Sequence, residues 1–111
     1  MKPLLPSLKE RKRYIVFEVY SEMKFNEQEV SKVIKDNLQK YTGEKGLALA
    51  GMQLTNWNDK LQRGIVRVNH DQADNTKASF IFIESINNAV CSVHSIGMSG
   101  ILNKAKQQYL R

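Results

Sequence analysis

Two arginines in one short stretch have the spacing best suited to binding a charged ligand. In residues 63–69 (RGIVRVN), Arg63, Ile65 and Arg67 fall on one face of an alternating pattern, and small or apolar residues fall on the other. This alternation is typical of a half-buried β-strand. Guanidinium groups bind phosphates and stack on bases, so the face with the arginines could hold a nucleic acid. An edge strand kept soluble by its arginines would show the same pattern.

Few other side chains suggest chemistry. His70, Asp71 and Asp74 form the only cluster of potential metal ligands in the sequence, but their spacing fits no zinc pattern. A small metal-dependent nuclease built on these three residues is the least favoured alternative. Cys91 lies in an apolar run that fits a buried strand, and His94 has no carboxylate near it in sequence for acid–base work. We therefore expect no catalytic residue, no metal site and no cofactor in this chain.

The positive charge is concentrated at the two ends of the chain. Residues 1–13 hold five basic residues and one acidic residue, and residues 97–111 hold three basic residues and no acidic residue. Residues 14–96, with nine basic and ten acidic residues, are nearly neutral. If both ends lie on one side of the fold, they form a basic patch that favours a polyanion. The alternative is that the basic ends serve solubility only.

Length and composition indicate an ordinary globular protein. The chain has 111 residues, 41% of them hydrophobic and 25% charged, with one cysteine. No apolar run approaches the roughly 20 residues that span a bilayer, and the N-terminus lacks the apolar core of a secretory signal. We expect one domain over residues 1–111, with a basic N-terminal arm over residues 1–13, in a cytoplasmic protein.

Hydrophobic periodicity predicts four strands and three helices. The strands are expected at residues 13–20, 52–57, 61–69 and 89–97, and the helices at 26–43, 71–86 and from Ser99 onward. Asn26 and Glu29 form a capping-box pattern at the start of the first helix. Gly43 is expected to end that helix in a left-handed conformation. Residues 43–51 then form either a short helical turn or a loop.

Two helix assignments depend on their caps. Asp71 is expected to cap the second helix, which favours a helix over a strand for residues 80–83 (FIFI) despite their strand propensity. Ser99 is expected to cap the last helix, with Ile101, Leu102, Ala105 and Leu110 on its apolar side.

The order of these elements predicts an α+β fold of the ferredoxin-like or RNA-recognition-like type. This fold is an α/β sandwich with a four-stranded antiparallel sheet and two packed helices, here with an extra C-terminal helix. The expected strand order, with the strands numbered along the chain, is 4-1-3-2. It places Tyr14 near Ile65 and Arg67, with His94 on the far side of the first strand. RNA-recognition modules use such a sheet face, which is open here unless the C-terminal helix or a partner covers it.

Three stretches, in the right order along the chain, resemble one known family. They are residues 4–15 (LLPSLKERKRYI), 64–67 (GIVR) and 96–101 (IGMSGI). Together they are similar to the ribonuclease P protein component 2 family, the archaeal relatives of a eukaryotic ribonuclease P and MRP subunit. Residues 43–60 depart from the pattern.

The resemblance implies a protein subunit of a ribonucleoprotein that removes the 5′ leader from precursor tRNA. It also implies that the RNA subunit carries the catalytic magnesium. The implied partners are the ribonuclease P RNA, the TIM-barrel-like component 3, other ribonuclease P proteins and, as an option, a second copy of this chain. A protein–protein adaptor on a ferredoxin-like fold is the alternative from another functional class.

Two sets of candidate binding residues follow from the pattern and the resemblance together. The expected RNA-binding residues are Lys9, Arg11, Lys12, Arg13, Tyr14, Arg63, Arg67, His94, Lys104 and Lys106. The expected partner-binding residues lie on the two longer helices and the stretch between the first helix and the second strand, and they are Val30, Ile34, Leu47, Leu49, Phe80 and Ile83. Burial of Leu47 and Leu49 in the core is the simpler expectation for that stretch.

Overall fold

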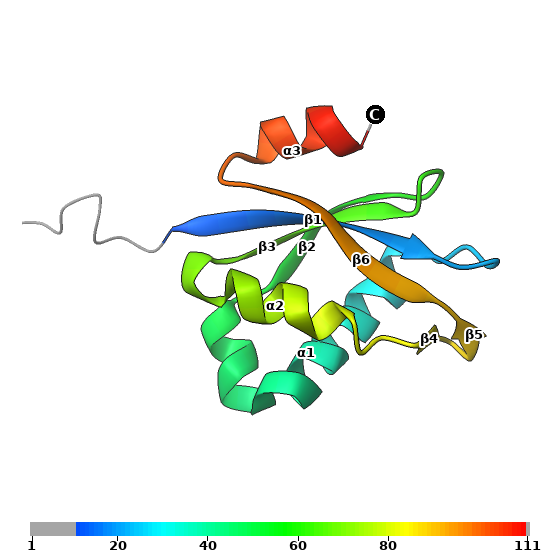
Figure 1. The fold of residues 1–111 in the computed structure, drawn as a ribbon, viewed down its shortest axis with the longest axis horizontal. Coiled ribbons are helices and arrows are strands. Elements are labelled where there is room, and N and C mark those ends of the chain that lie inside the picture. Colours follow the sequence, from blue (N-terminus) through cyan, green and yellow to red (C-terminus); the bar gives the residue numbers. More distant parts are fainter. Residues whose placement is uncertain (1–10, 111) are drawn as a thin grey trace, which may run out of the picture.

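The computed structural model describes residues 11–110, in which helices cover both faces of a four-stranded sheet (Figure 1). Within these residues, no helix combines the length and apolar character needed to cross a bilayer. In chain order the elements are β1 (Lys12–Tyr20), α1 (Glu27–Ala50), β2 (Gln53–Asn58), β3 (Arg63–Asn69), the short 3-10 helix η2 (His70–Gln72), α2 (Ala73–Phe80), β4 (Ser85–Ile86), β5 (Ala89–Val90), β6 (Ser92–Ser99) and α3 (Leu102–Tyr109).

The sheet has the strand order β2-β3-β1-β6, and its three pairings are antiparallel. This confirms the α+β fold class predicted from the sequence and the predicted order of strands, with β6 as the fourth strand. The pairing places Tyr14 opposite Arg67 on β3 and Glu18 opposite His94 on β6. The neighbours inferred from the strand order are therefore present.

Helices α1 and α2 cover one face of the sheet and enclose the larger core (Figure 1). The ring of Phe17 lies at its centre, with centroids 5.6 Å from Phe80 and 6.0 Å from Trp57. Around these rings lie fully buried aliphatic side chains from the sheet, from α1 and from β4: Ile15, Val30, Ile34, Leu38, Val66, Val68 and Ile86.

Helix α3 covers the opposite face of the sheet (Figure 1). Val16, Ile65 and Ala105 are fully buried beneath it. The helix lies very close to the sheet because Gly97 has no side chain: a Cβ atom built there would be 2.3 Å from Cζ of Tyr109. Ile65, which the strand pattern placed between two exposed arginines, is consequently a core residue.

The predicted start of the first helix is confirmed, and the helix is interrupted at Gly43, where it is predicted to end. The Asn26 side chain accepts from the Glu29 N–H at 2.8 Å, and the Glu29 carboxylate accepts from the Asn26 N–H at 3.0 Å. Gly43 leaves the helical conformation with φ +82° and ψ 173°, so its φ is positive but it is not in the predicted left-handed helical region. A further helical segment follows, which is the helical one of the two alternatives for residues 43–51, and it ends at Gly51 in the left-handed conformation. The helix continues past Gly43 because Leu47 and Ala50 pack against the core.

The second predicted helix, residues 71–86, is wrong at both ends. Asp71 lies in η2, and α2 begins after Gln72 with no side-chain hydrogen bond at its cap. The helix ends at Phe80 because the next residues cannot all reach the core: Ile81 is 71% exposed and Phe82 is 57% exposed.

A short hairpin of β4 and β5 replaces the end of that helix. Asn87 and Asn88 join its two strands, with φ of 51° and 66°. Two-residue hairpin turns favour positive φ at both positions, and asparagine tolerates that conformation better than most residues. The strand predicted at 89–97 is accordingly divided at Cys91 into β5 and β6.

The last helix begins later than predicted. Ser99 does not cap it; its hydroxyl oxygen accepts from the Ile101 N–H at 3.0 Å, and Ile101 is itself the N-cap residue. Leu102, Ala105 and Leu110 pack against the sheet as expected. Ile101, expected on the same apolar side, is 53% exposed because the helix starts after it.

Replacement of Gly97 by alanine should destabilise the protein by about 1–3 kcal/mol, since the added methyl group would overlap the ring of Tyr109. Urea unfolding monitored by circular dichroism measures this change. Gly100→Ala is the matched control, because the nearest atom to its new Cβ, Nη1 of Arg13, is at an ordinary contact distance of 3.6 Å. Equal stability of the two variants would contradict the close packing of α3 on β6.

Candidate nucleic-acid interface

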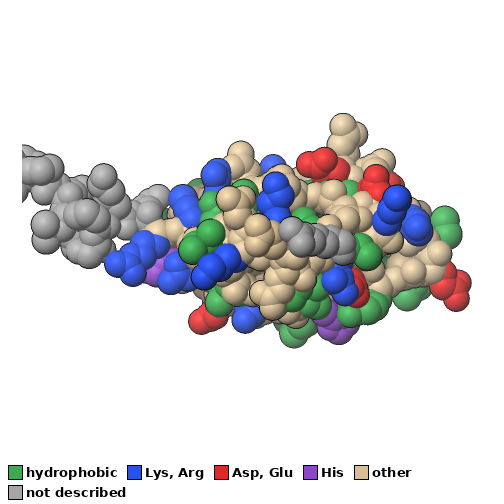
Figure 2. Space-filling view, turned by 90° about the horizontal axis from the view of Figure 1, so that it is seen from above, with side chains coloured by type: hydrophobic (Ala, Val, Ile, Leu, Met, Phe, Trp, Pro, Cys, Tyr) green, Lys and Arg blue, Asp and Glu red, His purple; other side chains and the backbone are tan. Residues whose placement is uncertain are grey.

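Positive side chains gather where β1 begins and β3 ends. The pairing of the two strands brings these ends together, and the His70 N–H donates to the Arg11 carbonyl oxygen at 2.8 Å. Figure 2 shows lysine and arginine side chains clustered at this end of the molecule. We call this region the basic end; its members within residues 11–110 are Arg11, Lys12, Arg13, Arg67 and Lys104.

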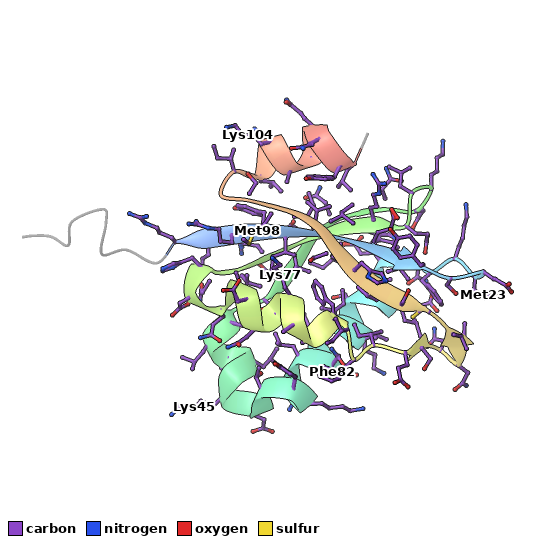
Figure 3. The ribbon with its side chains drawn as sticks, viewed as in Figure 1. Met23, Lys45, Lys77, Phe82, Met98 and Lys104 are labelled. Atoms are coloured by element: carbon purple, nitrogen blue, oxygen red, sulfur yellow. The ribbon has the colours of Figure 1, made fainter. Side chains whose placement is uncertain are left out.

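The turn between β6 and α3 joins the basic end to the C-terminal helix. Tyr14 is paired with Ser99, so Arg13 lies beside Gly100, and its Nη1 would be 3.6 Å from a Cβ atom built there. Lys104 follows in the first turn of α3, on the side of the molecule where β1 begins (Figure 3). Arg13 and Lys104, one from each basic end of the sequence, therefore lie on one side of the part of the fold that the structure describes, an arrangement that suits a polyanion.

Local hydrogen bonds orient the cations of the strands. Lys12 donates to the Asn69 side chain across the strand pair, and Arg13 donates to the Lys12 carbonyl oxygen at 3.2 Å. Arg67 donates to the Gln53 side chain on β2, and its Nε is buried with no hydrogen-bond partner among the described residues. Part of the Arg67 guanidinium is thus out of the reach of a phosphate.

Arg63 and His94 lie at the other end of the sheet, away from the basic end. Arg63 Nε donates to the Glu18 carboxylate at 2.7 Å, and Arg63 Nη1 donates to the Tyr109 carbonyl oxygen at 3.1 Å. The charge of Arg63 is therefore balanced, and one of its donors holds the end of α3. The His94 ring stands edge-on to Tyr20 with centroids 5.1 Å apart.

Strand pairing places the Glu18 carboxylate beside His94, although the two residues are far apart in the sequence. Desolvation alone would raise the pKa of Glu18, but hydrogen bonds from Arg63 and Tyr20 and the charges of Arg63 and His94 outweigh it and lower the pKa. The hydrogen bond to Glu18 in turn raises the pKa of Tyr20. This cluster is a charge-balanced contact between strands rather than a phosphate site.

The remaining expected RNA-binding residues have separate positions. Tyr14 is half-buried against α3, so it does not offer a free ring for base stacking. Lys106 is exposed on α3, and Lys9 lies outside the described residues. Because α3 covers this face, the sheet does not offer the open surface that RNA-recognition modules use.

The candidate metal ligands do not converge. His70 and Asp71 lie in η2 and Asp74 lies in the first turn of α2. Within residues 11–110, no group of three or more His, Cys, Asp or Glu side chains is arranged to hold a metal ion. Cys91 is buried, and this burial raises the pKa of its thiol.

Most of the expected partner-binding residues are buried. Val30, Ile34, Phe80 and Ile83 belong to the core between the sheet and the two helices, so a partner cannot reach them in this fold. This burial corrects their assignment to a docking surface. Leu47 is half-buried against the core, whereas Leu49 is 53% exposed.

An exposed aromatic pair occupies the outer side of the helical layer instead. Tyr41 on α1 is 45% exposed and Phe82 is 57% exposed, with ring centroids 5.3 Å apart. We call Tyr41 and Phe82 the aromatic patch. A groove of about 350 Å³ next to Phe82 is lined by Val33, Asp36, Asn37, Lys40, Ile83, Glu84 and Ser85. The sequence signal for the exposure of Phe82 was the Asn87-Asn88 pair. Two consecutive asparagines favour a hairpin turn, and a hairpin at this point requires the preceding helix to end before Phe82.

Comparison with known proteins identifies the family. Residues 13–110 match the model of the Rpp14/Pop5 family. The ribonuclease P protein component 2 of Pyrococcus furiosus is 31% identical over 109 residues, covering 98% of this chain and 91% of the relative. The protein of the same description from Methanocaldococcus jannaschii is 33% identical over 110 residues, covering 99% and 81%.

The fold is also found in a solved assembly. One chain of the cryo-EM structure of yeast ribonuclease MRP superposes with a TM-score of 0.67 at 15% identity, covering 83% of this chain and 76% of that chain. At this identity, the likeness shows a shared fold.

Removal of the Glu18 carboxylate by Glu18→Gln should make stability less dependent on pH in the acid range. The lowered pKa in the folded state means that Glu18 stabilises the fold fully above its ordinary pKa of 4.5, and that this contribution is lost as pH falls through the lowered pKa. The parent should therefore exceed the variant by up to about 1 kcal/mol near neutral pH and approach it in acid.

Urea unfolding between neutral and acid pH measures this difference. Glu44→Gln, at an exposed position of α1, is the control and should follow the parent curve. A constant gap between the parent and Glu18→Gln at every pH would contradict the role given to the ion pair.

Proposed function

Because the chain belongs to the Rpp14/Pop5 family and is a protein subunit of ribonuclease P, we propose that its basic end binds the phosphate backbone of the ribonuclease P RNA. The endoribonuclease activity belongs to the whole ribonuclease P holoenzyme, and this chain is a non-catalytic subunit of it. In this proposal the RNA removes the 5′ leader from precursor tRNA, and the protein stabilises the RNA structure that does so.

The observation that supports the proposal is that Arg13, from the first basic segment, and Lys104, from the last, lie on one side of the fold. Arg13 lies beside the turn that leads to Lys104, and Arg11 is hydrogen-bonded to the start of η2. Lysine and arginine side chains that neutralise phosphates release counterions, and they also reduce the repulsion between neighbouring RNA helices. Folding of the RNA would then need less magnesium in solution.

The chemistry in this proposal belongs to the RNA. We place the catalytic magnesium ions on the RNA subunit and no cofactor on this chain. The support for this division is the family membership together with a protein surface whose charged groups suit phosphate contacts. The protein acts by positioning RNA, and its variants should therefore change RNA affinity before they change the chemical step.

A protein partner also fits the surface. We propose that component 3 docks on the aromatic patch, where two large exposed rings border the groove next to Phe82. Exposed aromatic side chains beside a groove often contribute most of the binding energy at protein–protein interfaces. The patch lies on the helical layer, on the other side of the sheet from α3 and Lys104 (Figure 3), so protein and RNA would not compete for one surface.

Loss of either Arg13, beside the β6–α3 turn, or Lys104, in the first turn of α3, should weaken RNA binding in a salt-dependent way. Arg13→Ala and Lys104→Ala should each reduce the slope of log K against log salt by roughly 0.7–0.9, the amount for one phosphate contact. Filter binding to the ribonuclease P RNA over a salt series measures the slope.

Lys45→Ala is the matched control for that series, because Lys45 is exposed on α1 across the sheet from Lys104 (Figure 3). Its slope should equal that of the parent. A parent slope retained by both Arg13→Ala and Lys104→Ala would remove the basic end from the RNA interface.

Introduction of charge into the aromatic patch should weaken docking of component 3. Phe82→Glu should weaken the complex at least about ten-fold, because a buried carboxylate without a partner is costly. Val90→Glu is the control, since Val90 is 83% exposed but lies on β5, outside the patch. Titration calorimetry against component 3 measures both, and equal affinities for Phe82→Glu and the parent would exclude the patch.

Reconstitution tests the function as a whole. The RNA subunit and component 3, assayed for leader removal at limiting magnesium, should gain activity when this chain is added. The Arg13→Ala, Lys104→Ala double variant should restore less activity at limiting magnesium and approach the parent at high magnesium. A chain that leaves activity unchanged at every magnesium concentration would refute the proposal.

A further inference from the structure

The cover that α3 gives to the sheet stops short of one corner. Helix α3 packs against Val16 and Ile65 in the two central strands, and within residues 11–110 the cluster that it buries includes no residue of the edge strand β2. Gln53, the first residue of β2, is exposed, and Arg67 opposite it on β3 is half-buried. Figure 2 looks onto the α3 side of the molecule and shows lysine and arginine side chains gathered at one end.

Strand register places three polar side chains in one row across this corner. Gln53 pairs with Arg67, and Arg67 pairs with Tyr14, so the three lie on the same side of β2, β3 and β1. This is the α3 side, because Tyr14 packs against the cluster under α3, whereas Val66 and Val68 on either side of Arg67 belong to the opposite core. Arg67 is a member of the basic end, so the polar corner adjoins it.

The contact between Arg67 and Gln53 decides which atoms of the amide face outward. Arg67 Nη2 donates to Gln53 Oε1. The Gln53 amide nitrogen is on the other branch, and it has no hydrogen-bond partner among residues 11–110. Arg67 Nε is buried, so this arginine offers a ligand fewer donors than an exposed one does. The corner therefore presents two oriented N–H donors of a neutral amide next to a positive charge.

We infer that Gln53 donates to a ribose 2′-hydroxyl oxygen of an A-form RNA helix whose phosphates are bound at the basic end, and that Arg67 positions the amide. The inference deepens the proposed function and rests on it. A-form RNA displays its 2′-hydroxyl groups in a wide, shallow minor groove that side chains can reach. Phosphate contacts do not distinguish RNA from DNA, whereas a contact to the 2′-hydroxyl does.

The groups at this corner favour a sugar contact over a stacked base or a protein. Tyr14, the one ring in the row, is half-buried against α3. Base stacking needs an accessible ring, and protein interfaces are centred on large side chains that become buried on binding. The corner offers instead the Gln53 amide beside two cations, Arg67 and Lys12, since Lys12 precedes Tyr14 by two residues in β1 and shares its side of the strand.

A pair of RNA probes isolates the contact to the sugar. One probe is a blunt-ended RNA duplex, and the other is the same duplex with a 2′-fluoro group in place of every 2′-hydroxyl. The two have the same bases and the same phosphates, but fluorine is a poor hydrogen-bond acceptor. In filter binding, the parent should prefer the hydroxyl duplex about five-fold, the size expected for one neutral hydrogen bond.

Two variants test the two roles. Gln53→Ala, at an exposed position, should bind the hydroxyl duplex about five-fold more weakly and the fluoro duplex as the parent does, with an unchanged salt slope because no cation is removed. Arg67→Met should also lose the preference, because the amide is no longer oriented; loss of charge alone would weaken both probes equally. Gln28→Ala is the matched control, since Gln28 is exposed in the first turn of α1, and it should keep the parental preference.

Several results would overturn the inference, and they differ from failure of the proposed function. A parent that binds the ribonuclease P RNA but shows no preference between the duplexes, or binds neither, refutes the sugar contact alone. A parental preference in Gln53→Ala excludes Gln53, and an equal loss on both probes assigns it to a base or a phosphate. A parental preference in Arg67→Met refutes the positioning role. If the parent binds neither the duplexes nor the ribonuclease P RNA, the proposed function fails, and the inference fails with it.

Discussion

Burial of β1 on both faces is the constraint on which the rest of the structure depends. Ile15 and Phe17 point into the core closed by α1 and α2, and Val16 between them is buried beneath α3; all three are 0% exposed. A strand covered on both sides has no face left for a ligand, because its side chains are already used to form the two layers. Binding must therefore occur at strand ends, at turns and on the outer sides of the helices.

Because both faces of β1 are buried, the charged side chains of the sheet lie toward its two ends. On the face covered by α3, Arg63 is paired with Glu18 and donates to the Tyr109 carbonyl oxygen at the end of α3, so the positive charge is balanced at that end of the sheet. At the opposite end, Arg13 lies beside the turn from β6 to α3, where Lys104 follows, and Arg11 lies next to the start of η2. The fold thereby separates a structural arginine from the cations that suit phosphates, although all of them look alike in sequence.

Local rules were sufficient where neighbours in sequence decide the outcome. The Asn26–Glu29 capping box formed as predicted, and the alternation of β1 and β3 gave both the strands and their pairing. The same rules failed for residues 71–86, because a helix pattern and an Asn87-Asn88 hairpin turn competed over the same segment. The hairpin prevailed since Phe80, Ile83 and Ile86 all reach the core only when the chain leaves the helix after Phe80.

By itself, the sequence determined the α+β fold, the strand order, the family resemblance and the basic character of the two chain ends. Only the tertiary structure decided which of those residues share a surface. Ile65 is buried and Tyr14 half-buried beneath α3, and Arg63 is paired with Glu18. Phe82, predicted to lie within a helix, and Ile101, predicted to lie on the apolar side of the last helix, are both exposed. The physical reason is that periodicity shows which residues share one side of an element, whereas burial depends on what packs against that side. Here the short helix α3 packs against the sheet only because Gly97, which has no side chain, leaves room for Tyr109.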